Sequence, residues 1–507
     1  MLARVFSACL TGIEAAFVRV EVDVSHGLPT FATVGLPDPA VRESRDRVRA
    51  ALRNSGFAFP QDRITVNLAP ADLRKEGVSF DLPIALGLLA AAGSVKPDRL
   101  RTLLVVGELA LDGGIYPVRG VLPMALAAVR ARLGGCLLAP GNAVEAAVVD
   151  GLAVYPVASL AEAAAFLNGE RAVEPATVDG ERLLAAARAD EVDFADVRGQ
   201  AHAKRALEIA AAGGHNVLML GPPGTGKTML ARRLPTILPP LSLAEALEVS
   251  AVWSVAGRLP AQGLLVERPF RAPHHTTSDA GLIGGGRVPH PGEVSLAHLG
   301  VLFLDELAEF PAHVLETLRQ PLEEGEVTVS RVGGSLTFPA EFQLVAATNP
   351  CPRGCRTLEA CRCAPGERAR YLVRVSRPLL DRIDIHLEVP PVPYRDLGGG
   401  PAGEESAAIR RRVMAAREQP RVRFGRARVR VNARMTARQV ARYCALPPEG
   451  RQLVGQAVDR LGLSARAHDR VLKVARTIAD LGGSDEIRLA HLAEALQYRG
   501  LDRWDAY

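Results

Sequence analysis

The chain has 507 residues, of which 48% are hydrophobic and 23% are charged, and its formal net charge is +5. A chain of this length exceeds one hydrophobic core, so we expect two to four domains of globular composition. The small net charge identifies no partner by itself. The longest apolar stretch, near Leu82–Gly93, is too short to span a bilayer, and MLARVFSACL lacks the apolar core of a secretory signal. We therefore expect a cytoplasmic protein without membrane contact.

The first 166 residues are predicted to form a mixed α/β domain. Ala- and Leu-rich helical stretches at Pro83–Ala92 and Val121–Arg132 alternate with strand-like runs. These runs lie at Phe17–Val22, Ile64–Leu68, Leu103–Val106 and Cys136–Ala139. A polar, Ala-rich linker is expected at residues 167–192.

The segment GPPGTGKT matches the Walker A pattern. The apolar run Asn216–Leu220 before it predicts a buried strand, and Met229–Leu234 after it opens a helix. A strand, a Gly-rich loop and a helix N-terminus make a cradle for phosphate, in which Lys227 would reach the β- and γ-phosphates and Thr228 would bind Mg²⁺. We therefore predict that ATP with Mg²⁺ binds to Gly221, Pro222, Pro223, Gly224, Thr225, Gly226, Lys227 and Thr228.

Two further apolar runs end in polar residues. VLFLDE at Val301–Glu306 predicts a buried strand from whose end Asp305 joins the magnesium shell and Glu306 polarises the attacking water. The alternative is a strand that ends in solvated acids. LVAATN at Leu344–Asn349 ends in an amide that can position this water. The order of P-loop, acidic strand and Asn strand is similar to that of AAA+ ATPases.

From about residue 192 onward the chain resembles the ComM/YifB group of magnesium-chelatase-like AAA+ ATPases. The resemblance is carried by VRGQAHAKRALEIAAAGGHNVLMLGPPGTGKTMLA, RPFRAPHHTTSDAGLIGGG, PGEVSLAHLGVLFLDELAEF and RPLLDRIDIHLEVP. It implies an α/β core at 193–392, with a parallel sheet and helices on both of its faces. A flexible segment at Leu397–Glu405 and a helical lid within 393–507 would follow.

The same resemblance assigns two arginines to the γ-phosphate. Arg382, in LLDRID, matches the arginine finger that acts on a neighbouring subunit, which implies a homohexameric ring. The alternative is an ion pair with Asp381 or Asp384 of the same subunit. Arg466 resembles the sensor-2 arginine of the lid, which reaches the γ-phosphate of its own subunit, and Arg470, one turn away, is the second candidate.

DNA contacts are expected at three places. The long separation between Lys227 and Asp305 leaves room for extra structure, and Glu326–Phe338 alternates like a hairpin with a turn at Gly333–Gly334. The resemblance suggests inserts that point into a central pore, where Arg287 and Arg331 would touch phosphates. Arg410–Arg442 is rich in arginine and suits salt-dependent phosphate binding. In each case the alternative is a set of solvated arginines.

Four cysteines follow the Asn strand within the insertion 351–363. Cys351, Cys355, Cys361 and Cys363 suit a tetrahedral structural zinc, although their spacing departs from paired CxxC motifs. The alternative is a flexible loop with free thiols. His274 and His275 lie in the family motif APHH, and we do not expect them to bind metal.

The N-terminal domain resembles the proteolytic domain of Lon through KEGVS, DLPIALGLL and GELALDGGIYPVRGVLPMALAA. Ser79 falls at the nucleophile and Leu122 at the position of the catalytic lysine. Without that amine, nothing evident deprotonates the serine, so we expect an inactive domain for assembly or substrate guidance.

Three functions compete. The ComM/YifB resemblance implies an ATP-driven DNA motor, a helicase or branch-migration enzyme acting on single-stranded or branched DNA in natural transformation. A chelatase-like ATPase that remodels a protein partner is the second. An ATP-dependent protease is the third, and the missing lysine argues against it. The motor is the preferred prediction.

Overall fold

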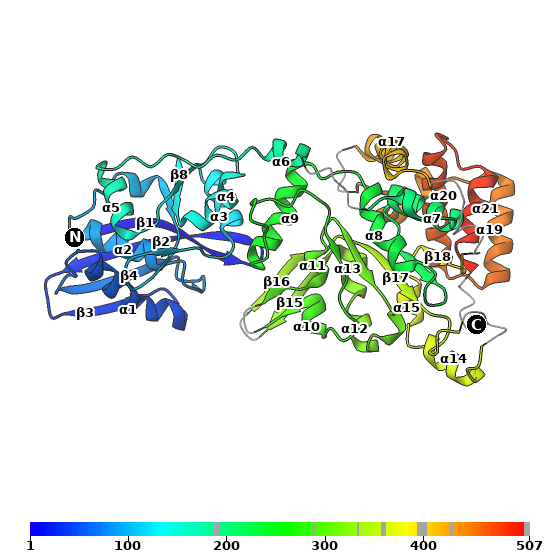
Figure 1. Ribbon diagram of the computed structural model, residues 1–507, viewed down its shortest axis with the longest axis horizontal. Coiled ribbons are helices and arrows are strands. Elements are labelled where there is room, and N and C mark those ends of the chain that lie inside the picture. The colour runs from blue at the N-terminus through cyan, green and yellow to red at the C-terminus, as the bar shows by residue number, and fades with distance from the viewer. Residues whose placement is uncertain are drawn as a thin grey trace. The chain divides into compact units, whose positions relative to one another are not determined.

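The computed structural model describes residues 1–186, 192–286, 289–331, 334–355, 361–392, 403–425 and 429–500 (Figure 1). The chain divides into two compact units. Met1–Ala187 and Ser242–Glu267 form the first unit, and Arg188–Leu241 and Arg268–Tyr507 form the second. The predicted domain boundaries stay predictions, as does the linker, of which residues 187–191 lie outside the described part and 180–186 are helical.

The first unit is built on a seven-stranded mixed sheet in the order β3-β4-β2-β1-β5-β8-β9. The four predicted strand runs are confirmed, because they fall in β2, β4, β5 and β8. The strands are β1 (Leu2–Thr11), β2 (Glu14–Ser25), β3 (Thr30–Val34), β4 (Arg63–Ala69), β5 (Leu103–Val105), β8 (Gly135–Leu138) and β9 (Ala153–Pro156), with a separate pair β6 (Glu108–Leu109) and β7 (Ile115–Tyr116).

Seven helices belong to the first unit among its described residues. They are α1 (Pro39–Asn54), α2 (Asp81–Ala91), α3 (Val121–Arg130), α4 (Ala143–Ala147), α5 (Leu160–Asn168), α6 (Gly180–Ala186) and α9 (Leu243–Val255). Helix α2 is buried on every side, as its continuous apolar sequence requires. Helix α9 begins in a capping box between Ser242 and Glu245 and packs against α3. Residues Ser242–Glu267, which lie between the Walker motifs in the sequence, therefore belong to the N-terminal unit.

The second unit contains an all-parallel sheet in the order β11-β14-β17-β10-β18. The strands are β10 (Val217–Leu220), β11 (Phe270–Arg271), β14 (Val301–Leu304), β17 (Gln343–Thr348) and β18 (Ile385–Glu388). Every residue of β10, β14 and β17 is buried. Burial on both faces explains why these strands read as unbroken apolar runs.

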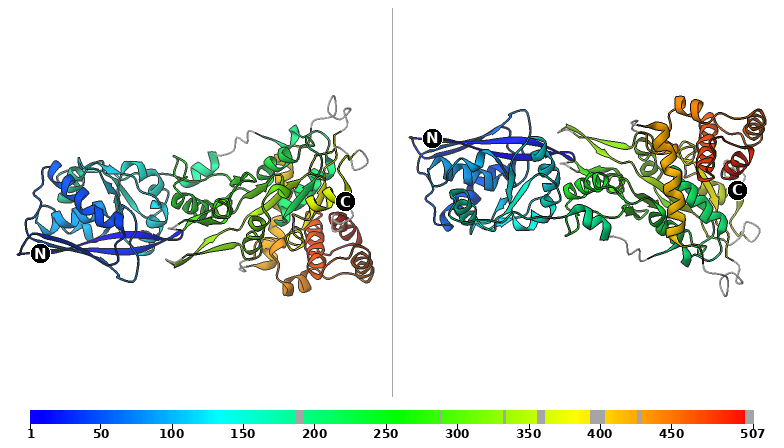
Figure 2. Two further views of the ribbon diagram at one scale, coloured as in Figure 1. Left: turned by 90° about the horizontal axis from the view of Figure 1, so that it is seen from below. Right: turned by 90° about the horizontal axis from the view of Figure 1, so that it is seen from above.

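Helices cover this sheet and continue into a C-terminal group. Those before β18 are α7 (Ala201–Gly213), α8 (Lys227–Ile237), α10 (Asp279–Ile283), α11 (Glu293–Leu296), α12 (Ala312–Glu316), α13 (Arg319–Glu324), α14 (Pro365–Leu372) and α15 (Arg377–Leu380). After β18 follow α17 (Ser406–Phe424), α18 (Ala437–Tyr443), α19 (Pro448–Leu461), α20 (Ala465–Leu481) and α21 (Leu489–Gln497). The last helices, orange to red, gather together (Figure 2). One hydrophobic core joins the sheet, α7 and α8 to α17 and α20.

Two short antiparallel pairs complete the second unit. β12 (Gly284–Gly285) pairs with β13 (His290–Pro291), and β15 (Glu326–Arg331) pairs with β16 (Gly334–Pro339) as a ribbon outside the five-stranded sheet (Figure 1). The predicted hairpin is therefore confirmed, although residues 332–333 at its turn lie outside the described part, as do residues 397–402 of the predicted flexible segment. The predicted fold class is confirmed: an α/β core with a parallel sheet and a helical C-terminal part follows a mixed α/β unit. Among the described residues, no helix is both long and apolar enough to cross a membrane.

Candidate nucleotide site

The Walker A loop lies where predicted, between β10 and α8. A side chain on Gly221 would place its Cβ 2.3 Å from the carbonyl oxygen of Val389, so this position accepts only glycine. Gly226 has a φ of +91°, which glycine adopts without strain, and α8 begins at the next residue. The loop therefore turns tightly and presents its backbone at the N-terminus of a helix, where anions bind favourably.

Lys227 is buried, with 7% of the residue exposed. Its ammonium group points back over the loop. It donates to the carbonyl oxygens of Gly221 at 2.6 Å and Pro222 at 2.8 Å, and it lies 3.3 Å from Oδ1 of Asn349. Burial lowers the pKa of Lys227, while the carboxylates of Asp305 and Glu306 act in the opposite direction. The strands β10 and β17 thus bring the predicted phosphate-binding lysine and the predicted water-positioning amide together.

The two predicted magnesium ligands also meet. The Thr228 hydroxyl donates to Oδ2 of Asp305 at 2.8 Å, although the two residues lie far apart in the sequence. Both follow the carboxyl ends of parallel strands, and such ends share one edge of the sheet. A hydroxyl and a carboxylate are oxygen ligands that suit Mg²⁺, so this pair fits the metal that the sequence predicts.

Glu306 is held in an unusual backbone conformation beside a histidine. Its φ is +53°, which is uncommon for a residue other than glycine, and its amide donates to Oδ1 of Asp305 at 3.0 Å. Oε2 of Glu306 lies 3.2 Å from Nδ1 of His275. From the sequence, His275 was a possible metal ligand only, and metal binding there was not expected. Its contact with the predicted water-activating acid was missed, and the one signal for it was the place of APHH in the family motif.

Arg382 lies at the opposite edge of the sheet, near the amino ends of the strands. Its carbonyl oxygen accepts from Nδ2 of Asn216, which precedes β10, whereas the Walker A loop follows that strand. Its buried guanidinium contacts Oε1 of Glu323 at 2.5 Å. This is an ion pair within the subunit, as in the alternative to the arginine finger, but with a different acid from Asp381 or Asp384.

The two lid arginines differ in their surroundings. Arg466 is 61% exposed and lies 4.0 Å from Glu323, so it joins Arg382 near one carboxylate. Arg470 forms an ion pair with the buried carboxylate of Asp384. Arg466 therefore has the freer side chain of the two sensor-2 candidates.

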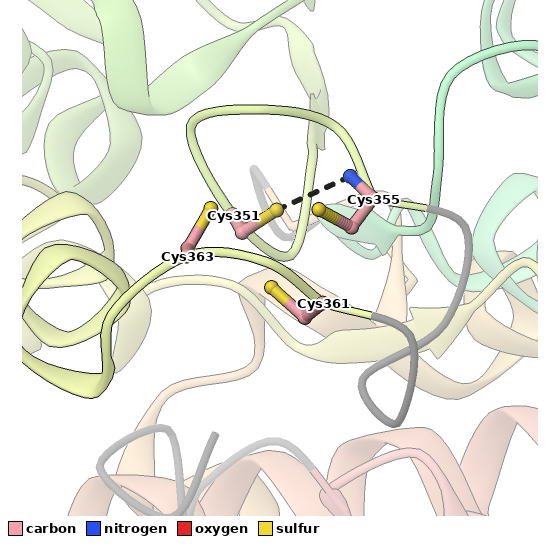
Figure 3. Close-up of side chains that lie close together, drawn as sticks. All are labelled: Cys351, Cys355, Cys361 and Cys363. Atoms are coloured by element: carbon pink, nitrogen blue, oxygen red, sulfur yellow. Dashed lines mark hydrogen bonds between the residues drawn. The ribbon is translucent and has the colours of Figure 1, made fainter.

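The four cysteines of the insertion converge (Figure 3). Their sulfur atoms all lie within 4.8 Å of one another, and the amide of Cys355 donates to Sγ of Cys351 at 3.2 Å. A tetrahedral zinc with bonds of about 2.3 Å needs sulfur–sulfur separations of about 3.8 Å, so a small contraction would complete such a site. Residues 356–360 lie outside the described part. The side chains fit a structural zinc.

The pKa values of the cysteine thiols are shifted in opposite directions. Burial raises the pKa of Cys351 to about 12 and also raises the pKa of Cys363. The backbone amide of Arg362 is the main cause that lowers the pKa of Cys355 to about 7. The same loop contacts the nucleotide site, because a Cβ on Gly354 would lie 2.6 Å from Cγ of Pro223. The cysteine loop therefore packs against the Walker A loop.

Several arginines of the basic stretch Arg410–Arg442 form ion pairs with acidic side chains of the same chain. Arg412 binds Glu208 and Glu404, and Arg423 binds Asp480. Others are exposed, namely Arg411, Arg421, Arg438 and Arg442. Arg287, Arg426, Arg428 and the side chain of Arg331 lie outside the described part. Fewer side chains of this stretch are available to phosphates than its composition suggests.

The predicted Lon-like positions are both buried in the first unit. Ser79 is 7% exposed and Leu122 is 0% exposed. Leu122 is the second residue of α3, and its amide donates to Oε1 of Glu145 at 2.9 Å. Helix α9 packs against the same helix α3. Leu122 supplies no amine, so this position offers no general base to Ser79.

A Walker A loop between a strand of a five-stranded parallel sheet and the helix that follows it, with an acid and an amide following two neighbouring strands, defines an AAA+ ATPase. Comparisons agree. The model "Magnesium chelatase, subunit ChlI" matches residues 193–397, "Subunit ChlI of Mg-chelatase" matches 20–142, and "Magnesium chelatase, subunit ChlI C-terminal" matches 403–499.

Two relatives match the chain over almost its whole length, and a third matches part of it. Competence protein ComM of Haemophilus influenzae is 47% identical over 504 residues, which cover 99% of this chain and 98% of the relative. Protein YifB of Salmonella typhimurium is 46% identical over 504 residues with the same coverage. The magnesium-chelatase 38 kDa subunit of Cereibacter sphaeroides is 29% identical over 178 residues, 31% of this chain and 52% of that protein. The chain belongs to the ComM/YifB family of magnesium-chelatase-like AAA+ ATPases, which implies ATP and Mg²⁺ as its ligands.

Proposed function

We propose that the protein is an ATP-driven motor on DNA, which works as a homohexamer in the cytoplasm and separates or exchanges strands during natural transformation. The convergence of Lys227, Thr228, Asp305 and Asn349 at one sheet edge carries the proposal of ATP hydrolysis. The assignment to DNA is supported by the full-length similarity to a relative named competence protein.

The chain's own groups divide the work of hydrolysis. Lys227 exchanges the loop carbonyls for the β- and γ-phosphates of ATP. The Thr228 hydroxyl and the Asp305 carboxylate would hold Mg²⁺, which would neutralise charge on those phosphates. Glu306 takes a proton from the attacking water, and His275 fixes the orientation of its carboxylate. Asn349 holds the same water by its amide.

Completion of the site requires a second subunit. Arg382 lies at the edge of the sheet opposite to the Walker A loop, so it reaches a γ-phosphate only in a neighbouring copy. Arg466 lies 4.0 Å from Glu323, the acid that also pairs with Arg382, so we assign it to the same neighbouring phosphate. This departs from its resemblance to a sensor-2 arginine, which implies the γ-phosphate of its own subunit. Both arginines neutralise charge that develops in the transition state, which makes turnover depend on ring formation.

DNA would pass along the hairpin β15–β16 and the remaining exposed arginines of the basic stretch. The hairpin stands outside the main sheet, which suits a moving loop in a pore. Arg411, Arg421 and Arg438 are exposed and suit contacts with phosphates. Such contacts release counterions, so the affinity for DNA must fall as the salt concentration rises.

The four clustered cysteines are proposed to hold one structural zinc. Zinc bound there would fix the loop that follows Asn349 and packs on Pro223. Its role would be structural: it would fix the position of the Asn349 amide relative to the Walker A loop, and it would not take part in ATP hydrolysis.

The test is ATP turnover of the purified full-length protein with no DNA, with single-stranded DNA and with forked DNA, across a salt series. Stimulation by DNA that fades with salt supports the motor, and strand displacement is the next assay. Lys227→Ala, which should lose nucleotide affinity, is the negative control. Turnover that DNA does not change would favour a chelatase-like ATPase that remodels a protein partner, a function motivated by the similarity to the magnesium-chelatase 38 kDa subunit.

A further inference from the structure

Glu323 sits between the two arginines that the proposed function assigns to a neighbouring ATP. It lies in α13, one residue before the helix ends. Its Oε1 is 2.5 Å from Nη2 of Arg382 and 4.0 Å from Nη2 of Arg466. The side chain of Glu323 is 47% exposed, whereas that of Arg382 is 3% exposed. One solvent-accessible carboxylate therefore faces two cations that come from distant parts of the sequence.

The guanidinium of Arg382 is incompletely satisfied in this position. Nη1 donates to the carbonyl oxygen of Pro378 at 2.6 Å, and Nη2 contacts Glu323. Nε is buried and has no hydrogen-bond partner among the described residues. Burial of a cation with an unmet N–H is costly, so the charge of Glu323 is the main compensation for keeping Arg382 here.

A cavity that neither Arg382 nor Arg466 lines lies directly beside Glu323. This cavity of about 220 Å³ is lined by Glu323 and Asp384 and by the cationic side chains Arg434, Arg470 and Lys473. The Asp384 carboxylate is committed to Arg470 and to the amide of Asn216. Glu323 is therefore the acid of this cavity that an incoming anion can replace.

We infer that Glu323 is a positioning residue that holds Arg382 and Arg466 of the same chain before the ring is assembled with ATP. The γ-phosphate of an ATP bound to a neighbouring subunit then replaces the Glu323 carboxylate. The inference rests on the proposed function. A γ-phosphate offers more charge and more acceptor oxygens than one carboxylate, so the arginines exchange a weaker partner for a stronger one. Until that exchange, Glu323 competes with ATP and lowers the apparent affinity of the ring for the triphosphate.

The exchange also connects the site to the hairpin. The carbonyl oxygens of Leu322 and Glu323 accept from Nη1 of Arg434 at 3.2 and 3.3 Å, and Gly325 then leads into β15. The backbone of Glu323 thus contacts Arg434 directly before the start of the proposed DNA-contacting ribbon, while its side chain holds Arg382.

The experiment compares the binding of adenylyl imidodiphosphate and ADP by the full-length protein at ring-forming concentration. Glu323→Gln keeps an acceptor but removes the charge. We expect it to raise the affinity for the triphosphate analogue about three- to tenfold and to leave ADP binding unchanged, because ADP has no γ-phosphate. Glu324→Gln is the matched control, since Glu324 is exposed on the same helix and accepts from Nε2 of Gln320 at 2.9 Å. This variant should behave as the wild type does.

A double variant makes the result specific. In an Arg382→Ala, Arg466→Ala background, Glu323→Gln should change neither affinity, because both competing partners are gone. The inference is overturned if the Gln variant shifts both nucleotides equally, shifts neither, or keeps its effect in that background. If the Gln variant does not fold, Glu323→Asp, which retracts the carboxylate, should give a smaller gain in the same direction. A wild type that binds the two nucleotides alike, with no loss of turnover in Arg382→Ala, would instead remove the proposed function.

Discussion

Nδ1 of His275 lies 3.2 Å from Oε2 of Glu306, and this contact joins the segment after β11 to the end of β14. The histidine is itself braced, because its ring lies 4.1 Å from that of His274 and meets Phe310 edge-on at 6.4 Å between centroids. A carboxylate that activates water must point in one direction, and Glu306 is half exposed. The ring of His275 supplies that constraint.

Replacement of His275 by alanine should lower kcat for ATP about tenfold, roughly 1.4 kcal/mol, with little change in KM. The carboxylate of Glu306 would then rotate freely, but the phosphate-binding loop would stay intact. His275→Gln should recover part of the loss, because its amide can still donate. His313→Ala is the control, since His313 is an exposed histidine on α12. Equal effects of the two alanine variants on kcat would contradict an orienting role.

Glu306→Gln should bind ATP with nearly normal affinity and hydrolyse it about 10²- to 10⁴-fold more slowly, because the amide cannot accept the proton of water. Single-turnover kinetics with a separate binding measurement distinguish the two effects. Glu309→Gln is the comparison variant, because Glu309 lies nearby and pairs with Arg374 at 3.2 Å. Normal turnover in Glu306→Gln would show that another group acts as the base.

The elements around the site were predictable because each is encoded locally. The runs that became β10, β14 and β17 are apolar on both faces, and each is followed by a motif whose chemistry fixes its place at the carboxyl edge. The meeting of Thr228 with Asp305 then follows from parallel strand order.

Contacts made by long side chains across the fold were not predictable in the same way. Arg382 has acids directly beside it in sequence, yet its guanidinium binds Glu323, 59 residues away. Helix α9 carries a clear capping box, but nothing in its sequence indicates that it packs against α3 of the N-terminal unit. Which side chain or helix pairs with which depends on how the folded surfaces fit together and on which buried charges still lack an opposite charge.

Purified protein should contain about one zinc per chain, and Cys351→Ser should lose it. Cys351 is buried and forms the start of the cluster, so loss of the metal leaves the loop without an anchor. The melting temperature should fall by about 5–10 °C. ATP affinity should fall as well, because Gly354 of the same loop packs on Pro223. Cys444→Ser, a buried cysteine elsewhere, should keep the metal. A Cys351→Ser variant with full zinc content, measured by mass spectrometry, would contradict the site.

Asp384 should stabilise the second unit by its charge. It is 1% exposed, and its Oδ2 accepts from the amide of Asn216 at 2.9 Å, while Arg470 forms an ion pair with it. Burial acts to raise the pKa of Asp384, but Arg470, His215 and this amide together hold it well below its usual range. Asp384→Asn should therefore lower the free energy of unfolding by about 2–4 kcal/mol, since it leaves Arg470 without its partner.

The dependence of this loss on pH has a definite sign. A carboxyl whose pKa is lower in the folded state stabilises the fold at every pH above its unfolded value of about 3.9, and the stabilisation declines as pH falls below that value. Urea unfolding followed by circular dichroism should thus give the same difference between wild type and Asp384→Asn at pH 7 and at pH 5. Asp469→Asn, which removes a half-exposed acid beside Arg470, is the control and should cost less than about 0.5 kcal/mol. A difference that is larger at pH 5 than at pH 7 would mean that burial raises the pKa of Asp384 and that Arg470 does not hold it down.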